Sequence, residues 1–306
     1  MRNTFADEIT KLAVEDERIV LLSSDIGNTL FDNYKMVAAN RFFNCGVAEA
    51  NMIGMSAGMA LCGLRPIAYA ITPFITTRCL EQIRVDVCYQ DMPVIMIGVG
   101  GGLSYAALGA THHSCEDIAF LRVIPNMQVI CPGDPVEVRL ALREAIRLSK
   151  PTYIRLGKKG EPVIHQEPPN FQIGKSITIS EGKDICLLST GNILPVSVET
   201  SKQLRASGIS IQLESFHTVK PLDQELLHNI FARFDLVVTV EEHSILGGLG
   251  GSVAEWLSEH SSQKAKLLRF GTPDTFLSQV GNQTYVRQHF GLTPENICRQ
   301  IISKLK

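Results

Sequence analysis

The sequence Gly46-Val47-Ala48-Glu49-Ala50-Asn51-Met52-Ile53-Gly54-Met55 places a single carboxylate in apolar surroundings. Between residues 42 and 64, Glu49 is the only acidic side chain, and no basic side chain occurs. Apolar or small residues follow Glu49 on every face of a helix, which predicts a buried helix. A carboxylate in the first turn of such a helix either complements the helix dipole and the free amides or has a specific partner. The spacing alone leaves both interpretations open.

The composition excludes several classes of protein. A chain of 306 residues is long for one hydrophobic core, so about two domains are expected. The net charge of -2 argues against nucleic-acid binding. Residues 1–8 include no apolar core region, so we expect no secretory signal there, and the least charged stretch, around residues 42–64, is a poor membrane span. The eight cysteines include no Cys-x-x-Cys pair, so we expect a reduced, cytoplasmic protein with no metal site of its own.

Short apolar runs that end in polar or glycine-rich turns predict parallel strands buried on both faces. The predicted strands cover residues 18–24, 67–71, 93–99, 127–131, 152–156, 185–190, 209–214, 236–240 and 266–270. Helical patterns lie between them, including a helix start at Asp134-Pro135-Val136-Glu137. The predicted fold class is therefore α/β, with two domains that each contain a mostly parallel sheet flanked by helices.

The pattern fades between residues 161 and 182, where prolines and polar residues gather. We interpret residues 161–182 as a linker between a first domain, 1–160, and a second domain, 183–306. Ligands of parallel sheets meet the carboxyl ends of the strands. Asp25, Glu49, Phe74 and the glycines 100–102 all fall at such positions.

Four motifs of the first half occur together, namely Gly-Val-Ala-Glu at 46–49, Phe74-x-x-x-Arg78, Gly-Ala-Thr-His at 109–112 and Ile-Pro-Asn-Met at 124–127. The second half adds Lys-Pro-Leu-Asp at 220–223, Glu-Glu-His at 241–243 and Gly-Gly-Leu-Gly at 247–250. In this order they resemble the pyrimidine-binding and carboxyl-terminal domains of the transketolase family. The resemblance covers essentially the whole chain. It implies a thiamine diphosphate-dependent transferase that moves a two-carbon ketol unit between sugars or sugar phosphates.

The resemblance also implies roles for individual residues. Glu49 would bind the aminopyrimidine ring of the cofactor, and a carboxyl desolvated on an apolar helix is suited to share the proton involved. Phe74 would stack on the pyrimidine, although an aromatic residue after a strand is by itself typical of a core. His112 would face the reacting carbons and transfer protons. Asp25 is a further candidate for cofactor binding.

Substrate contacts are expected from His112, His113, Arg78 and Lys158. Lys158 stands where the family has an arginine for the substrate phosphate, but it could equally be a solvated charge beside Lys159. Two positions differ from the family. Leu108 replaces an aspartate that reads a sugar hydroxyl, and another substrate histidine of the family falls near Gly100. The common pentose and heptose phosphates are therefore not the expected substrates.

The family binds the diphosphate and its metal through Gly-Asp-Gly and a later asparagine, in a separate amino-terminal domain. No Gly-Asp-Gly occurs in this sequence. We therefore expect the carboxyl-terminal subunit of a split enzyme, active only with an amino-terminal transketolase subunit that binds most of the diphosphate and Mg²⁺. The apolar helix after Glu49 suits a large interface, and the family suggests a heterotetramer in which the chain also self-associates.

Other functions remain open at this stage. The beta subunit of a 2-oxo-acid dehydrogenase and deoxyxylulose-phosphate synthase are built in a similar way. A dinucleotide-binding protein would use the glycines at 248–251, but Val253 stands where its third glycine belongs. A catalytically silent structural subunit is the remaining alternative. The sequence does not indicate the donor ketose or the acceptor aldehyde.

Overall fold

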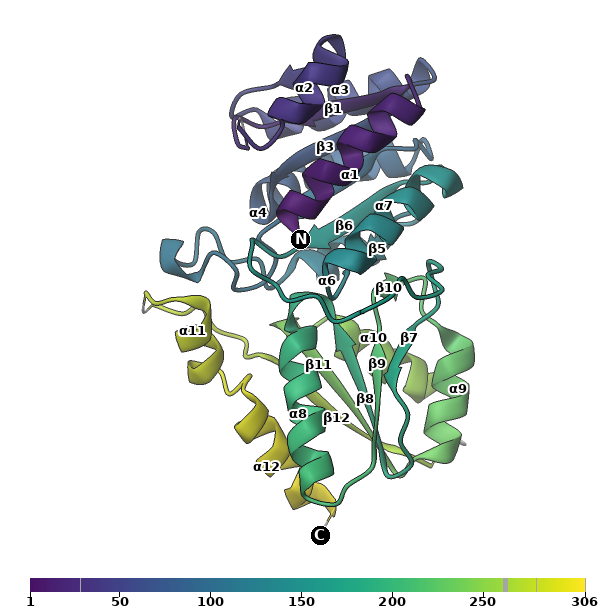
Figure 1. Ribbon diagram of the computed structural model, residues 1–306, viewed down its shortest axis with the longest axis vertical. Coiled ribbons are helices and arrows are strands. Elements are labelled where there is room, and N and C mark those ends of the chain that lie inside the picture. The colour runs from purple at the N-terminus through teal and green to yellow at the C-terminus, as the bar shows by residue number, and fades with distance from the viewer. Residues whose placement is uncertain (28, 261–263, 279, 306) are drawn as a thin grey trace.

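The computed structural model describes residues 1–27, 29–260, 264–278 and 280–305. It contains two sheets of seven and five strands, each flanked by helices, in two domains arranged one after the other along the long axis (Figure 1). The predicted α/β class with two mostly parallel sheets is confirmed. The main elements of the first domain are α1 (Arg2–Glu15), β1 (Ile19–Ser23), α2 (Asp32–Ala38), β2 (Phe42–Asn44), α3 (Glu49–Leu61), β3 (Arg65–Ile71), α4 (Thr72–Ile75), α5 (Leu80–Gln82), β4 (Ile95–Val99), α6 (Asp117–Arg122), β5 (Gln128–Ile130), α7 (Pro135–Leu148) and β6 (Thr152–Leu156).

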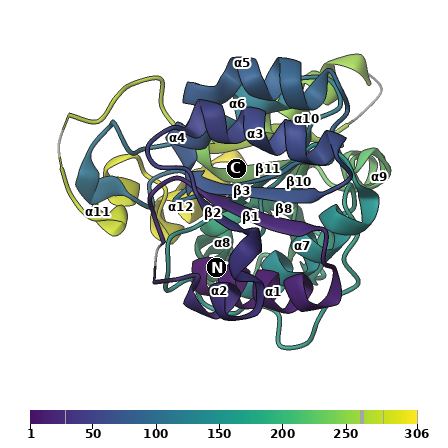
Figure 2. The ribbon, with the colours of Figure 1, turned by 90° about the horizontal axis from the view of Figure 1, so that it is seen from above.

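The first sheet has the order β10-β5-β6-β4-β3-β1-β2. Every neighbouring pair is parallel except β10 with β5. Helices α1, α2 and α7 cover one face, and α3, α4 and α5 cover the other (Figure 2). Because both faces are covered, β1, β4 and β6 are buried along their whole length.

The second sheet has the order β12-β11-β8-β9-β7, with only β7 antiparallel to its neighbour. Helices α8 and α12 pack together on one side of it (Figure 1). The elements after the first domain are β7 (Ile177–Ser180), β8 (Ile185–Thr190), α8 (Leu194–Ala206), β9 (Ile211–Ser215), β10 (Thr218–Lys220), α9 (Gln224–Arg233), β11 (Leu236–Ser244), α10 (Leu249–Glu259), β12 (Lys266–Thr272), α11 (Gln283–His289) and α12 (Pro294–Leu305).

The two antiparallel strands differ from the sequence prediction. Strand β7 lies inside the segment 161–182 that was expected to be only a linker. Strand β10 follows that segment in sequence but joins the sheet of the first domain. Both strands are short and lie at sheet edges, where the long apolar run that marks a central strand is not needed. As a result, one strand of the second half, β10, crosses the junction and completes the edge of the first sheet.

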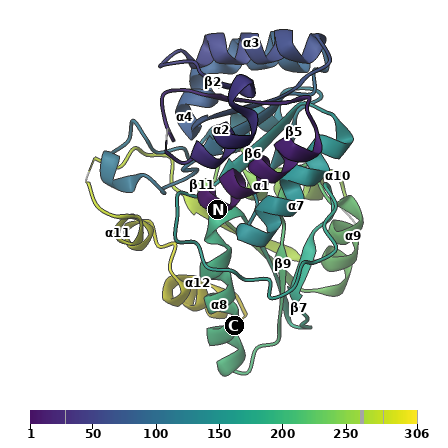
Figure 3. The ribbon, with the colours of Figure 1, turned by 45° about the horizontal axis from the view of Figure 1, so that its top comes forward.

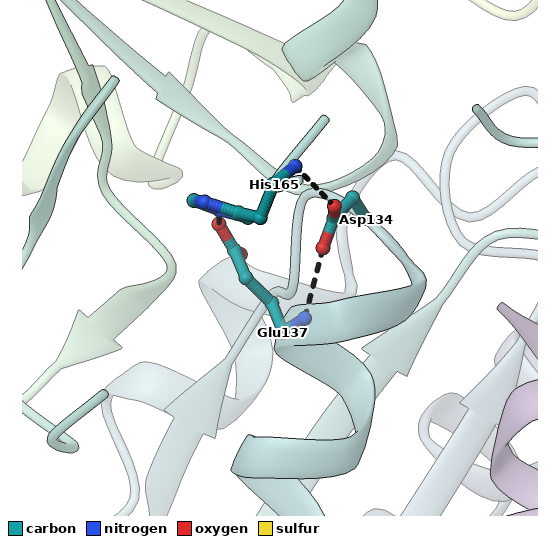
Figure 4. A group of neighbouring side chains, drawn as sticks. All are labelled: Asp134, Glu137 and His165. Carbon is teal, nitrogen blue, oxygen red and sulfur yellow. Dashed lines mark hydrogen bonds and ion pairs between the residues drawn. The ribbon is translucent and has the colours of Figure 1, made fainter. Parts of the chain in front are cut away.

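The segment after β6 is fixed to the first domain by Asp134, Glu137 and His165 (Figure 4). Asp134 caps α7 by accepting from the Glu137 amide, and it also accepts from the amides of Ile164 and His165. The His165 ring lies 2.8 Å from the other carboxylate, that of Glu137. The ligand atoms of the three side chains lie within 4.8 Å of one another, as in a cation site. Because hydrogen bonds already occupy both carboxylates, we interpret the group as an anchor for this segment.

His217, between β9 and β10, is fully buried at the domain junction. Its ring stacks on Phe171 with 4.0 Å between the ring centroids. Burial lowers the pKa of His217 to about 4. The folded protein therefore holds this imidazole neutral at pH values where an exposed histidine is protonated.

This buried imidazole predicts a loss of stability in mild acid. Between pH 6.5 and 4 the unfolded chain binds a proton at His217 that the folded chain does not bind, so the free energy of unfolding falls as the pH is lowered. The free energy of unfolding should therefore decrease between pH 7 and pH 5, and we expect this decrease to be smaller by about 2 kcal/mol in His217→Asn. Urea midpoints of wild type and variant at the two pH values measure this. An identical pH dependence in the two proteins would contradict the assignment.

No helix in the described ranges combines the length and the apolar character needed to cross a membrane.

Candidate functional site

Glu49 is the first residue of α3, and its side chain is buried, with 2% of the residue exposed. Ala48 is the N-cap and provides no side-chain cap. The Glu49 carboxylate instead binds the guanidinium of Arg78, with 2.5 Å between Oε2 and Nη1. Of the two interpretations left open by the sequence, the structure therefore shows the specific partner.

The sequence predicted that helix α3 is buried on every face, but in the structure one side of it is exposed. Met52, Ile53 and Ala57 pack into the core, whereas Gly58 and Leu61 are exposed. The helix runs along the edge of the molecule (Figure 3). The prediction of a fully buried helix is thus wrong for the single chain, because apolar and small residues also occupy the side that this chain leaves uncovered.

Phe74 and His112 lie beside the Glu49–Arg78 pair. Phe74 is in α4, at the carboxyl end of β3, and the Arg78 guanidinium carbon lies 4.5 Å from its ring centroid. The His112 ring meets Phe74 edge-on at 5.2 Å between centroids. The structure therefore brings together, as one row of contacting side chains, four residues predicted from three separate motifs: Glu49, Arg78, Phe74 and His112.

Tyr105 extends this row and was not predicted. Its ring centroid lies 6.5 Å from that of His112, and the Lys158 ammonium lies 4.8 Å from the Tyr105 centroid. Lys158 is thus connected to His112 through one aromatic ring. An aromatic residue soon after the glycines at 100–102 was the only signal in the sequence.

Asp25 and His113 have different surroundings from this row. Asp25 has a positive φ of 41° and pairs with Asn44, on the segment leading to α3. His113 lies next to Ala106, with 3.4 Å between Nε2 and the carbonyl oxygen. It lines a cavity of about 370 Å³ together with Glu116 and residues 272–277. Burial raises the pKa of Glu116 in that cavity.

A buried ion pair joins β6 to the start of α6, which follows the loop that carries His112. Arg155 of β6 donates from Nε to Asp117 at 2.8 Å, and both side chains are almost completely buried. Tyr153 donates to the same carboxylate oxygen at 2.6 Å. Arg155 also donates from Nη2 to the carbonyls of Ser114 and Glu242, each at 2.9 Å. One guanidinium thus connects the first domain, the loop and the second domain.

Two family models match the chain, the transketolase pyrimidine-binding domain at residues 1–161 and the transketolase C-terminal domain at residues 174–297. The chain belongs to the transketolase family. It corresponds to the carboxyl-terminal section of these transferases, as the sequence predicted.

Individual transketolase subunits are similar to this chain over nearly their whole length. An apulose-4-phosphate transketolase component from Phocaeicola vulgatus is 33% identical, covering 100% of this chain and 97% of its own. A 6-deoxy-6-sulfo-D-fructose transketolase subunit of a Clostridium species is 34% identical, covering 98% and 92%. A solved structure described as a split-gene transketolase, an inactive β4 tetramer, has a TM-score of 0.90 at 32% identity and covers 99% and 97%.

Transketolases depend on thiamine diphosphate, and the residues of this chain fit the pyrimidine end of that cofactor. A buried carboxylate can pair with an aminopyrimidine, and the half-buried Phe74 ring offers a face for stacking. The Arg78 guanidinium, planar and polar, already lies between these two groups. The arrangement is therefore suited to a flat, hydrogen-bonding ring.

Proposed function

We propose that this chain is the carboxyl-terminal subunit of a split, thiamine diphosphate-dependent transketolase-like enzyme that transfers a two-carbon ketol unit between sugar-type substrates. The observation that carries the proposal is the row formed by Glu49, Arg78, Phe74 and His112. The whole-chain match to transketolase subunits favours ketol transfer over the 2-oxo-acid dehydrogenase alternative.

Each residue of the row has a chemical task in this proposal. When bound, thiamine diphosphate supplies the carbon nucleophile that attacks the ketose. Glu49 hydrogen-bonds the aminopyrimidine ring and holds the proton shared with it. Phe74 stacks on that ring and excludes water. His112 exchanges protons with the substrate oxygens during addition and release.

Anionic substrates suit the two cations that lie against these rings, Arg78 and Lys158. The two named relatives act on a sugar phosphate and on a sulfo sugar. Lys158 and Arg78 are separated by Phe74, His112 and Tyr105, so a sugar chain lying along these rings would present its charged end to one of them. We therefore propose that Arg78 and Lys158 bind the anionic group, with Lys158 acting as a point charge.

The diphosphate and Mg²⁺ are proposed to bind mainly to an amino-terminal partner subunit. The uncovered apolar side of α3, the helix that begins with Glu49, supports an interface along this helix. The solved relative described as an inactive β4 tetramer supports self-association of such chains without activity. Asp25, next to the segment leading to α3, is proposed to contact the cofactor from this side.

The two adjacent histidines are expected to differ in importance. In the complete assembly, His112→Ala should lower kcat by about 100-fold or more, the range expected for loss of a general acid–base group. His113→Ala is the matched variant and should lower kcat much less, because His113 faces the cavity at 272–277. Steady-state kinetics of both variants measure the ranking. If His113→Ala lowered kcat more than His112→Ala, the assignment of His112 as the proton-transfer group would be wrong.

A further inference from the structure

The loop that carries His112 closes on itself at its base. Gly102 and Ser114 exchange two backbone hydrogen bonds, at 2.8 and 2.9 Å, as an isolated antiparallel bridge. Residues between them, including Tyr105 and His112, are therefore placed by whatever holds this base. A loop of this kind does not determine its own position, because a rigid support is needed to align a proton-transfer group.

The support comes from the end of β11, in the second domain. The Leu103 amide donates to Glu242 Oε1 at 2.8 Å. The Ser244 amide donates to the Cys115 carbonyl at 2.6 Å. Both ends of the loop thus make hydrogen bonds to a three-residue segment that lies more than 120 positions further along the chain.

Glu242 is held in turn by its other neighbours. The residue is fully buried, and its carboxylate accepts from Asn192 Nδ2 and Gln283 Nε2, each at 2.9 Å, and from Arg287 Nε. These donors come from the turn after β8 and from α11. The four hydrogen-bond donors fix the carboxylate from the loop side and from the second domain.

Gly102 shows how closely the loop approaches Glu242. A Cβ atom at Gly102 would lie 2.5 Å from the Glu242 carbonyl oxygen and 2.6 Å from its Oε1. Gly102 also has a φ of 64°, which favours glycine. The close contact therefore leaves no room for a side chain at position 102.

We propose that Glu242 is a positioning residue for ketol transfer, through which the second domain fixes the loop that presents His112 to the reacting atoms. This inference rests on the proposed function of His112. Glu49 and Phe74 lie on α3 and α4, outside the loop, so cofactor binding does not depend on Glu242. Loss of the support is expected to impair proton transfer and leave the cofactor site intact.

The test compares Glu242→Gln with Glu214→Gln in the complex that co-purifies with this chain. Glu214 is an equally buried carboxylate of the second domain, bound by Gln212, Thr178 and Ser176 away from the loop. Glu242→Gln places an amide nitrogen against other donors. It should lower kcat on the order of 100-fold, as expected for a misplaced catalytic group, with the Kd of thiamine diphosphate within about twofold of wild type. Glu214→Gln should leave kcat unchanged.

A double-variant cycle separates positioning from general damage. If Glu242 acts through His112, then adding Glu242→Gln to His112→Ala lowers kcat little further. Additive losses, or a parallel fall in cofactor affinity, would overturn the proposal. Gln283→Ala serves as the second variant if Glu242→Gln fails to fold. Gln283 is half-buried, and its removal takes one hydrogen-bond donor from the Glu242 carboxylate, so this variant should reproduce the kcat defect in milder form.

Amide hydrogen exchange gives a measurement that does not need activity. Exchange over residues 102–115 should be faster in Glu242→Gln, or in Gln283→Ala, than in wild type and Glu214→Gln. Unchanged exchange there would refute the supporting role even if activity fell. If the wild-type complex transferred no ketol unit, the proposed function would fall, and exchange would still decide whether Glu242 holds the loop.

Discussion

Glu49→Gln is expected to lower the turnover of the complete assembly by about 10³-fold, within the range attributed to a positioned acid–base group. The amide has the same shape as the carboxyl group, so α3 and its packing should be preserved. It cannot share a proton with the aminopyrimidine ring, and the activation that depends on this proton is lost. Initial rates with saturating thiamine diphosphate and Mg²⁺ measure the effect.

Glu8→Gln is the matched control for this variant. Glu8 is also a buried carboxylate paired with arginines, Arg139 and Arg143, but it lies on α1, away from the row. Both variants therefore weaken a buried ion pair, and only one removes the proposed catalytic group. Equal activity in the two variants would remove Glu49 from the reaction and return it to a structural role.

Arg155→Met is expected to have the largest effect on stability, a loss of about 3–5 kcal/mol in the free energy of unfolding. The substitution leaves Asp117 buried as an uncompensated charge, and Oδ1 of that carboxylate already has no hydrogen-bond partner among the described residues. It also removes two hydrogen bonds that join the loop to the second domain. Urea denaturation monitored by circular dichroism measures the change.

Two further variants test this explanation. Adding Asp117→Asn to Arg155→Met should restore part of the stability, because the unpaired charge is removed. Arg147→Met breaks an exposed ion pair with Glu144 on α7 and should leave the urea midpoint unchanged. An equal loss in the Arg147 and Arg155 variants would mean that burial of the Arg155–Asp117 pair is not the cause.

The central strands could be predicted from the sequence because they are buried on both faces. Strands β6 and β8 have the predicted bounds, residues 152–156 and 185–190. Edge strands β7 and β10 were missed because three or four residues with Thr, Ser and Lys give no apolar run. Their partners lie far away in the sequence, so tertiary pairing decided their structure.

The site was predictable where a short motif carries the chemistry, and the four residues of the row, Glu49, Arg78, Phe74 and His112, came from such motifs. Tyr105 and Glu242 were not identified as site residues. Glu242 stood within the Glu-Glu-His motif at 241–243, but its partner Leu103 is 139 positions away. A supporting role of this kind depends on a contact between domains, which the spacing of residues does not reveal.

The most direct test of the split-enzyme account is the binding of thiamine diphosphate with Mg²⁺, measured by isothermal titration calorimetry. The complex that co-purifies with this chain from its native host is compared with the chain alone at the same concentration. We predict tight binding by the complex and none by the isolated chain, because Glu49 and Phe74 contribute only the pyrimidine end of the site. Tight binding by the isolated chain, or none by the complex, would contradict the account.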